Sequence, residues 1–209
     1  MNLVYEKKEG KYLQYSSAQL DALKKKYKKL AVIIDRFGYL EREVNPDVFS
    51  ALIGSIVSQQ ISSKAAQTVT ERLNELCKGI SPEKLFAAEE TDIQKCGMSI
   101  RKAGYIKAAA QAVCEGTLEI SSLKEMEDED VIKLLSSLPG IGVWTAEMLL
   151  IFSLERMDVL SYGDLAIRRG ICKLYGHKEL TKEQFDRYKK RYSPYGSIAS
   201  LYLWHLSVE

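Results

Sequence analysis

Apolar positions recur three and four residues apart along almost the whole chain, with polar and charged positions between them. That spacing is typical of an α-helix with one buried face. The strict alternation of apolar and polar residues that marks a half-buried strand is almost absent. One apolar stripe contains Leu20, Leu23, Tyr27, Leu30, Ile34 and Phe37, and another contains Val69, Leu73 and Leu76. The pattern predicts an all-α protein.

Capping signals predict where several of these helices begin and end. Ser81 before Pro82 predicts a helix start, because serine caps backbone N–H groups and proline fits the first turn. Thr181 with Gln184 three residues later has the form of a capping box. Glycines predict helix ends at Gly79, Gly116 and Gly176. The least helical stretches are residues 1–15, 38–45, 116–128 and 157–163.

The composition is that of an ordinary globular protein, with 209 residues, 46% hydrophobic and 28% charged. This length suits one large domain or two small ones. Residues 1–11 are charged, and no apolar run reaches the roughly 18 residues that span a bilayer. We therefore expect a soluble cytoplasmic protein without a signal peptide, associated with the nucleoid if the cell is prokaryotic.

Cysteine spacing argues against a metal cluster. The four cysteines lie too far apart for a zinc ribbon or a closely spaced four-thiolate iron–sulfur site. We expect reduced, mostly buried thiols and no iron–sulfur cluster. The residues concerned are Cys77, Cys96, Cys114 and Cys172.

Charge is almost balanced overall, at +2, but basic residues cluster locally. One run lies in residues 24–29 and another in residues 182–191. Either run could contact phosphates, although charge runs on helices are more often solvated faces.

The most informative segment is residues 131–154, where an amphipathic stretch ends at Leu-Pro-Gly-Ile-Gly and an apolar helix begins at once. The glycines allow a tight turn and close approach of a ligand. The N–H groups of Gly140, Gly142 and Thr145 open a helix whose dipole favours an anion, and a DNA phosphate fits such a site. A tight interhelical turn without a ligand explains the same five residues equally well.

An acid follows this segment at Asp164, just before another predicted helix that runs toward Tyr175. Aspartate is a favoured N-cap, so capping alone explains an acid at this position. However, a hairpin, a helix, a short loop and an acid in this order resemble the helix-hairpin-helix DNA glycosylases, which have a Gly/Pro-rich loop and a catalytic aspartate (HhH-GPD).

Within that superfamily the chain is similar to the 3-methyladenine DNA glycosylase II (AlkA-like) branch, over roughly residues 14–207. Residues 138–146 have that branch's form of the hairpin. Residues 56–65 resemble its DNA-wedge segment, residues 97–103 its next turn, and residues 192–195 its C-terminal pocket segment. Four motifs in the right order make chance a poor explanation.

The resemblance implies a fold and a reaction. The fold would be two helical subdomains, residues 1–45 with 150–209 and residues 46–149 ending in the hairpin, with the DNA cleft between them. The reaction would be removal of alkylated purines such as 3-methyladenine and 7-methylguanine from double-stranded DNA, after the damaged base is flipped out. We expect a monomer that binds damaged duplex DNA and no membrane.

The resemblance also assigns roles to residues. Asp164 would stabilise the positively charged sugar of the transition state, and one acid suffices because an alkylated base leaves neutral. Trp144 stands where members that also nick the backbone carry a nucleophilic lysine, which implies hydrolysis without a lyase step. Gln60, with Gln59, would fill the gap left by the flipped base; the alternative is that both cap their turn.

Base recognition would rest on aromatic faces. Trp144 and Tyr195 would form walls of the base pocket, because electron-rich rings attract a cationic purine. Packing in the apolar core is the alternative for both. The sequence departs from the family pattern at two positions, with Met148 in place of a pocket aromatic and Gly163 in place of a second acid.

The family's hairpin also binds Na⁺ or K⁺ through main-chain carbonyls, which by position would be those of Ser136, Leu138 and Ile141. We expect no other cofactor. Two alternative functions remain open: a glycosylase for hypoxanthine, uracil or 8-oxoguanine, and a non-catalytic DNA-binding hairpin module. A pure binder needs neither Asp164 nor the Gln59-Gln60 segment.

Overall fold

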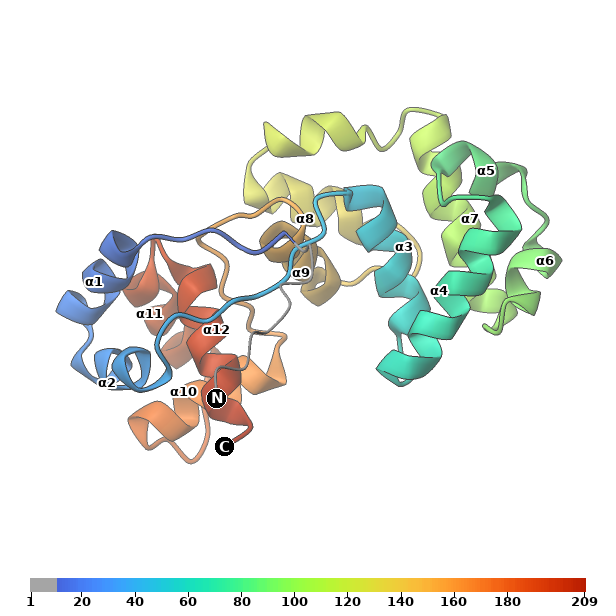
Figure 1. Ribbon diagram of the computed structural model, residues 1–209. Helices are drawn as coiled ribbons and strands as arrows, with labels where there is room; N and C mark the ends of the chain where they lie inside the picture. The colour runs from blue at the N-terminus through green and yellow to red at the C-terminus, as the bar shows by residue number, and fades with distance from the viewer. Residues whose placement is uncertain (1–10) are drawn as a thin grey trace, which may run out of the picture. The chain divides into compact units, whose positions relative to one another are not determined.

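The computed structural model describes residues 11–209 and shows an almost entirely helical chain (Figure 1). Strands are absent from these residues, where one isolated antiparallel bridge joins Tyr12 and Glu43. The prediction of an all-α protein is confirmed. In the same part of the chain, no helix has the length and apolar character needed to cross a membrane.

The chain divides into two compact units. Unit 1 comprises Met1–Val44, described from residue 11, and Glu155–Glu209; unit 2 comprises Asn45–Leu154. The helices of unit 1 are α1 (Ser17–Lys26), α2 (Lys28–Phe37), α10 (Leu165–Tyr175), α11 (Lys182–Tyr192) and α12 (Gly196–Ser207). Those of unit 2 are α3 (Val48–Ser58), α4 (Ser63–Cys77), α5 (Pro82–Ala87), α6 (Glu90–Lys95), α7 (Ile100–Cys114), the 3₁₀ helix η1 (Ile120–Lys124), α8 (Asp128–Ser136) and α9 (Val143–Phe152).

The predicted caps are confirmed. The Ser81 side chain caps α5, which begins at Pro82, and Thr181 forms a capping box with Gln184 at the start of α11. The predicted glycine stops all have positive φ and lie at or just beyond the ends of α4, α7 and α10.

Both apolar stripes needed correction. The first is divided between α1 and α2, because Tyr27 leaves the helical backbone at φ −134° and ψ 86°. In the second, Leu76 is 42% exposed while Cys77 is buried. The buried face therefore continues from Val69 through Leu73 to Cys77 in steps of four residues, as helical geometry requires.

The expectation of mostly buried thiols is only partly right. Cys77 and Cys96 are buried, but Cys114 is exposed and Cys172 is partly exposed. All four are free. Burial raises the pKa of the Cys77 thiol, which disfavours its reactive thiolate form.

The core of unit 1 depends on close contact between α10 and α12. A Cβ on Gly170 would lie 2.3 Å from the carbonyl oxygen of Leu203, so only glycine allows the two helices to approach this closely. Because α10 begins directly after Asp164, this contact helps to fix the proposed catalytic residue in unit 1.

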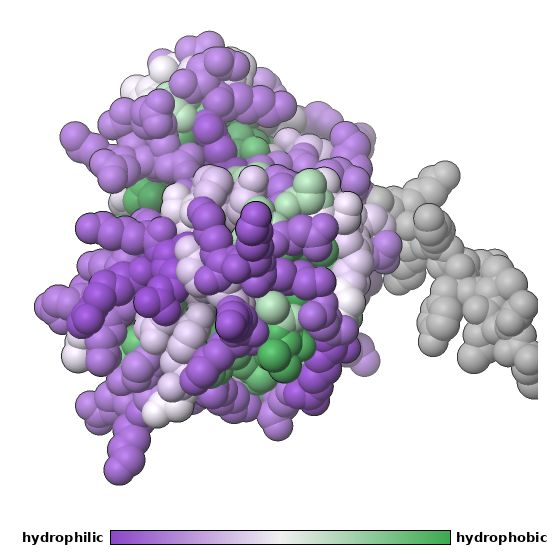
Figure 2. Space-filling model, turned by 90° about the vertical axis from the view of Figure 1, so that its left-hand side faces the viewer, coloured by the Kyte–Doolittle hydropathy of each residue, from purple (hydrophilic) through white to green (hydrophobic). Residues whose placement is uncertain are grey.

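Polar side chains cover most of the face in Figure 2, where apolar patches are small and separated. Exposed large apolar residues are few, and two of them are adjacent in the sequence at the start of α9. Val143 is 55% exposed and Trp144 is 49% exposed. Such side chains are candidates for ligand contact because burial in the core does not explain them.

Candidate active site

The predicted helix-hairpin-helix is confirmed in unit 2. Helix α8 ends at Ser136 and helix α9 begins at Val143. The turn between them is closed by a 3.1 Å hydrogen bond from the N–H of Ile141 to the carbonyl of Leu138. Gly140 has φ +83°, in the left-handed region that favours glycine.

The start of α9 has the features of an anion site. Gly142 is its N-cap residue, is exposed, and has no heavy atom within 4 Å of the place where a Cβ would lie. No side chain caps this helix end. The first N–H groups of a helix have no intrahelical partner, and the helix dipole adds positive potential there. A phosphate can therefore approach the backbone at Gly142.

The turn that would act as a DNA wedge also lies in unit 2, between α3 and α4. Gln60 is exposed at φ +58°, an uncommon backbone conformation for a residue other than glycine. Gln59 is directed elsewhere: its amide Nε2 donates a 2.7 Å hydrogen bond to the carbonyl of Gly140. The structure thus brings the wedge turn and the hairpin into direct contact.

Two of the three proposed base-pocket residues lie on α9. Trp144 is in the first turn and is 49% exposed, so the alternative that it packs in the apolar core is wrong. Met148 lies one turn further along and is partly buried. Tyr195 belongs to unit 1, is partly exposed, and directly precedes α12.

Asp164 is the N-cap residue of α10 and is 7% exposed. Its Oδ1 accepts a 2.9 Å hydrogen bond from the backbone N–H of Ile167. The capping geometry expected from the sequence is therefore present. This bond fixes the orientation of the carboxylate at the start of α10.

Three residues that the sequence analysis missed attach the loop before Asp164 to the start of α12. Asp158 accepts hydrogen bonds from the Ser193 hydroxyl at 2.5 Å and from the Gly196 N–H at 3.1 Å. The Ser197 hydroxyl donates to the carbonyl of Arg156, and that of Ser200 to the carbonyl of Val159.

Within unit 1, these bonds hold residues 156–159, in the loop that leads to Asp164, against the segment that contains Tyr195. A sequence signal was present, because Ser197 and Ser200 lie three residues apart among apolar residues in the first half of α12.

The two basic runs are partly neutralised within unit 1. Lys24 pairs with Asp35 at 2.5 Å, and Lys182 pairs with Asp186 on the next turn. Basic residues also line a pocket of about 490 Å³ in unit 1, to which α10 contributes Arg168 and Arg169 among others. Its lining is completed by Leu165, Cys172, Lys173, Lys178, Glu179 and Leu180.

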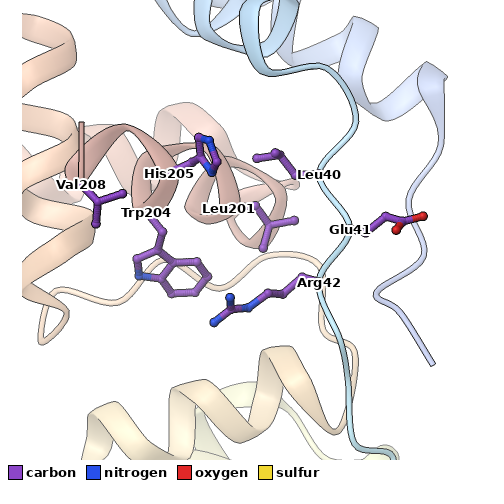
Figure 3. Close-up of a pocket in the computed structure, with 7 residues that line it drawn as sticks. All are labelled: Leu40, Glu41, Arg42, Leu201, Trp204, His205 and Val208. Atoms are coloured by element: carbon purple, nitrogen blue, oxygen red, sulfur yellow. The ribbon is translucent and has the colours of Figure 1, made fainter. Parts of the chain in front are cut away.

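A second pocket of unit 1, of about 290 Å³, contains none of the predicted site residues. In Figure 3 the guanidinium of Arg42 is directed toward the indole of Trp204, whereas Glu41 points away from the other labelled side chains. The remaining lining residues are Leu40, Leu201, His205 and Val208.

Comparisons with known proteins place this geometry in a family. The model of the HhH-GPD superfamily base excision DNA repair proteins matches residues 53–194. DNA-3-methyladenine glycosylase 1 of Schizosaccharomyces pombe is 30% identical over 99% of this chain and 94% of its own length.

Solved structures agree with this result. A DNA-3-methyladenine glycosidase from Bacillus halodurans has a TM-score of 0.86 and 35% identity, over 94% of this chain and 92% of that one. The S. pombe 3-methyladenine DNA glycosylase Mag1 in complex with abasic DNA has a TM-score of 0.77 and 29% identity, over 90% of this chain and 95% of that one. The chain therefore belongs to the HhH-GPD superfamily of base excision DNA repair proteins.

Proposed function

We propose that this chain is a monofunctional DNA glycosylase that hydrolyses the N-glycosidic bond of alkylated purines, 3-methyladenine and 7-methylguanine, in double-stranded DNA. The observation that carries this proposal is Asp164, a 7% exposed carboxylate fixed at the start of α10 in a chain of this superfamily. The names of the relatives described above support the class of substrate.

The chemistry follows from the charge of the substrate. When the bond from C1′ to an alkylated base breaks, its electron pair neutralises the base and leaves positive charge on the sugar. A fixed carboxylate stabilises that charge and accepts the proton of the water that adds to C1′. Asp164 suits this role because its bond to the Ile167 N–H orients it before substrate arrives.

The absence of a lyase step rests on Trp144. An indole cannot form an imine with C1′, so water is the nucleophile and the products are a free base and an intact abasic strand. The exposed ring of Trp144 suits stacking on a flipped purine, with Met148 behind it on the same helix. Tyr195 would supply a further aromatic face.

Contacts to undamaged DNA follow from the hairpin and the wedge turn. The N–H groups at the start of α9 would hold a backbone phosphate, which positions DNA without reading its sequence. Gln60 would enter the stack where the damaged base has left. The protein would act as a monomer on duplex DNA.

The hairpin would also hold a Na⁺ or K⁺ ion through the carbonyls of Ser136, Leu138 and Ile141. The donor set fits, since monovalent and other hard cations take oxygen ligands. One of these oxygens, that of Leu138, already accepts the N–H of Ile141 and keeps its second lone pair. Such an ion would stiffen the turn that presents Gly142.

The proposal is tested with purified protein and duplexes that each contain one defined lesion: 3-methyladenine, 7-methylguanine, hypoxanthine, uracil or 8-oxoguanine. Asp164→Asn should lower single-turnover base release by a factor on the order of 10² to 10³, while asparagine still caps α10. Asp47→Asn is the matched control, because Asp47 caps α3 through the Ser50 N–H at 3.0 Å.

The control variant should release base at the wild-type rate. Substantial base release by Asp164→Asn would remove this residue from the mechanism.

A further inference from the structure

Three contacts in unit 2 join the wedge turn, the hairpin and α7. The first is the 2.7 Å hydrogen bond from the Gln59 side chain to the carbonyl of Gly140, which links residues 81 positions apart. Because the Gln59 amide is already bonded, inserting this side chain into DNA would leave a partly buried carbonyl without its donor, which is costly.

The second contact holds the wedge turn from α7. The Nζ of Lys102 donates to the carbonyl of Val57 at 2.9 Å and to that of Gln59 at 2.5 Å. These oxygens lie at the C-terminal end of α3, where carbonyls lack intrahelical partners and a cation is favourable. Desolvation lowers the pKa of Lys102, consistent with a side chain drawn away from solvent.

The third contact connects α7 to the hairpin. A Cβ on Gly140 would lie 2.2 Å from the ring of Tyr105, so this ring packs directly against the glycine backbone. Tyr105 lies three residues after Lys102, on the same side of α7. One face of α7 therefore supports both the wedge turn and the hairpin.

These contacts give Gln59 and Gln60 different tasks. Gln60 is exposed at the tip with φ +58°, whereas Gln59 and Lys102 are bonded inward. We infer that Gln59 and Lys102 are positioning residues, which fix the tip at Gln60 relative to the phosphate-binding hairpin. When the hairpin binds a DNA phosphate, Gln60 is therefore placed at the base stack. The inference rests on the proposed function and assigns the inserted side chain to Gln60 rather than to Gln59.

The test measures wedge insertion without base release. For each variant, the affinity for a duplex with a tetrahydrofuran abasic-site analogue is divided by the affinity for the same duplex without it. Gln59→Met keeps the length of the side chain and removes the donor. It should lower this ratio about tenfold, the effect of losing one buried hydrogen bond.

Affinity for intact duplex and its salt dependence should stay unchanged, because the N–H groups of the hairpin remain. Gln67→Met is the matched control, since Gln67 donates to Glu71 on the exposed surface of α4, and it should keep the wild-type ratio.

A double-mutant cycle separates positioning from general stabilisation. If Gln59 acts through the wedge, Gln59→Met should have no further effect on the ratio in a Gln60→Ala background. Equal losses in both backgrounds, or an unchanged ratio for Gln59→Met alone, would overturn the inference.

Lys102 provides a second route if Gln59→Met does not fold. Lys102→Met should lower the ratio and Lys102→Arg, which keeps charge and donors, should largely restore it; equal ratios for the two variants would contradict the inference. Wild-type release of 3-methyladenine is measured in parallel. If the wild-type protein did not release 3-methyladenine, the proposed function would be refuted, whereas the affinity ratios test the positioning role of Gln59 and Lys102.

Discussion

Alanine substitution of the two hairpin glycines should have different effects: at Gly140 it should lower stability, and at Gly142 it should weaken DNA binding. Gly140 has φ +83° and its Cβ would meet the Tyr105 ring at 2.2 Å. Placing alanine in the left-handed region costs about 1–2 kcal/mol, and overpacking a filled site costs about 1–3 kcal/mol. Gly140→Ala should therefore lower the free energy of unfolding by roughly 2–5 kcal/mol, a large share of the roughly 5–15 kcal/mol of a typical domain.

Gly142 lacks both constraints. Its φ of −97° and ψ of 170° suit any residue, and the space around its Cβ position is open. Gly142→Ala should change the free energy of unfolding by less than about 1 kcal/mol, because alanine restricts the unfolded chain but is a poorer N-cap than glycine. It should nevertheless weaken DNA binding, since the new methyl group projects where a phosphate would approach.

Urea unfolding and affinity for an undamaged duplex distinguish these effects. Gly140→Ala should lower the urea midpoint with an unchanged slope, whereas Gly142→Ala should shift the midpoint little and lower DNA affinity. In a Tyr105→Ala background, the steric part of the Gly140→Ala cost should disappear. The reasoning would be refuted if Gly142→Ala destabilised the protein as much as Gly140→Ala, or if removing the Tyr105 ring gave no relief.

Three further predictions concern the reaction. Borohydride added during turnover should trap no covalent protein–DNA adduct; an adduct would reveal an amine nucleophile and contradict the role of Trp144. In single turnovers, 7-methylguanine should be released faster than 8-oxoguanine opposite cytosine, because a cation over an aromatic face gains about 0.5–2 kcal/mol and its glycosidic bond is weaker; the reverse order would mean that the pocket recognises a base edge. At constant ionic strength, replacing Na⁺ and K⁺ with a bulky organic cation should weaken binding to undamaged duplex if the hairpin carbonyls hold an ion, and equal affinities would remove that site.

Local patterns were sufficient to predict most of the fold. Helical periodicity, the Ser81 and Thr181 caps and the glycine stops all depend on residues within one or two turns of each other. The break at Tyr27 was missed because its apolar spacing fits a continuous helix, and only the backbone conformation shows the interruption. The hairpin and the N-cap position of Asp164 were predictable for the same local reason.

The parts of the site that were not predicted depend on contacts distant in sequence. Gln59 and Gly140 are 81 residues apart, Lys102 and Gln59 are 43 apart, and Asp158 and Gly196 are 38 apart. Each contact joins a side chain to backbone, and backbone groups are the same at every position. Such contacts therefore leave no recognisable pair of residue types in a single sequence.

Asp164 can both cap α10 and act in catalysis. Its burial is the feature that capping alone does not explain. Asp47 caps α3 through the same hydrogen bond to the third residue of its helix, yet it is exposed, so capping does not require burial. Removing a carboxylate from water is costly unless other interactions compensate. Asp164 is only 7% exposed, whereas Asp47 shows that capping alone is possible at the surface. A water-excluded, preoriented carboxylate is what stabilisation of a sugar cation requires, because electrostatic interactions strengthen when water is removed. The N-cap bond is thus the means by which the fold holds the proposed catalytic group in place.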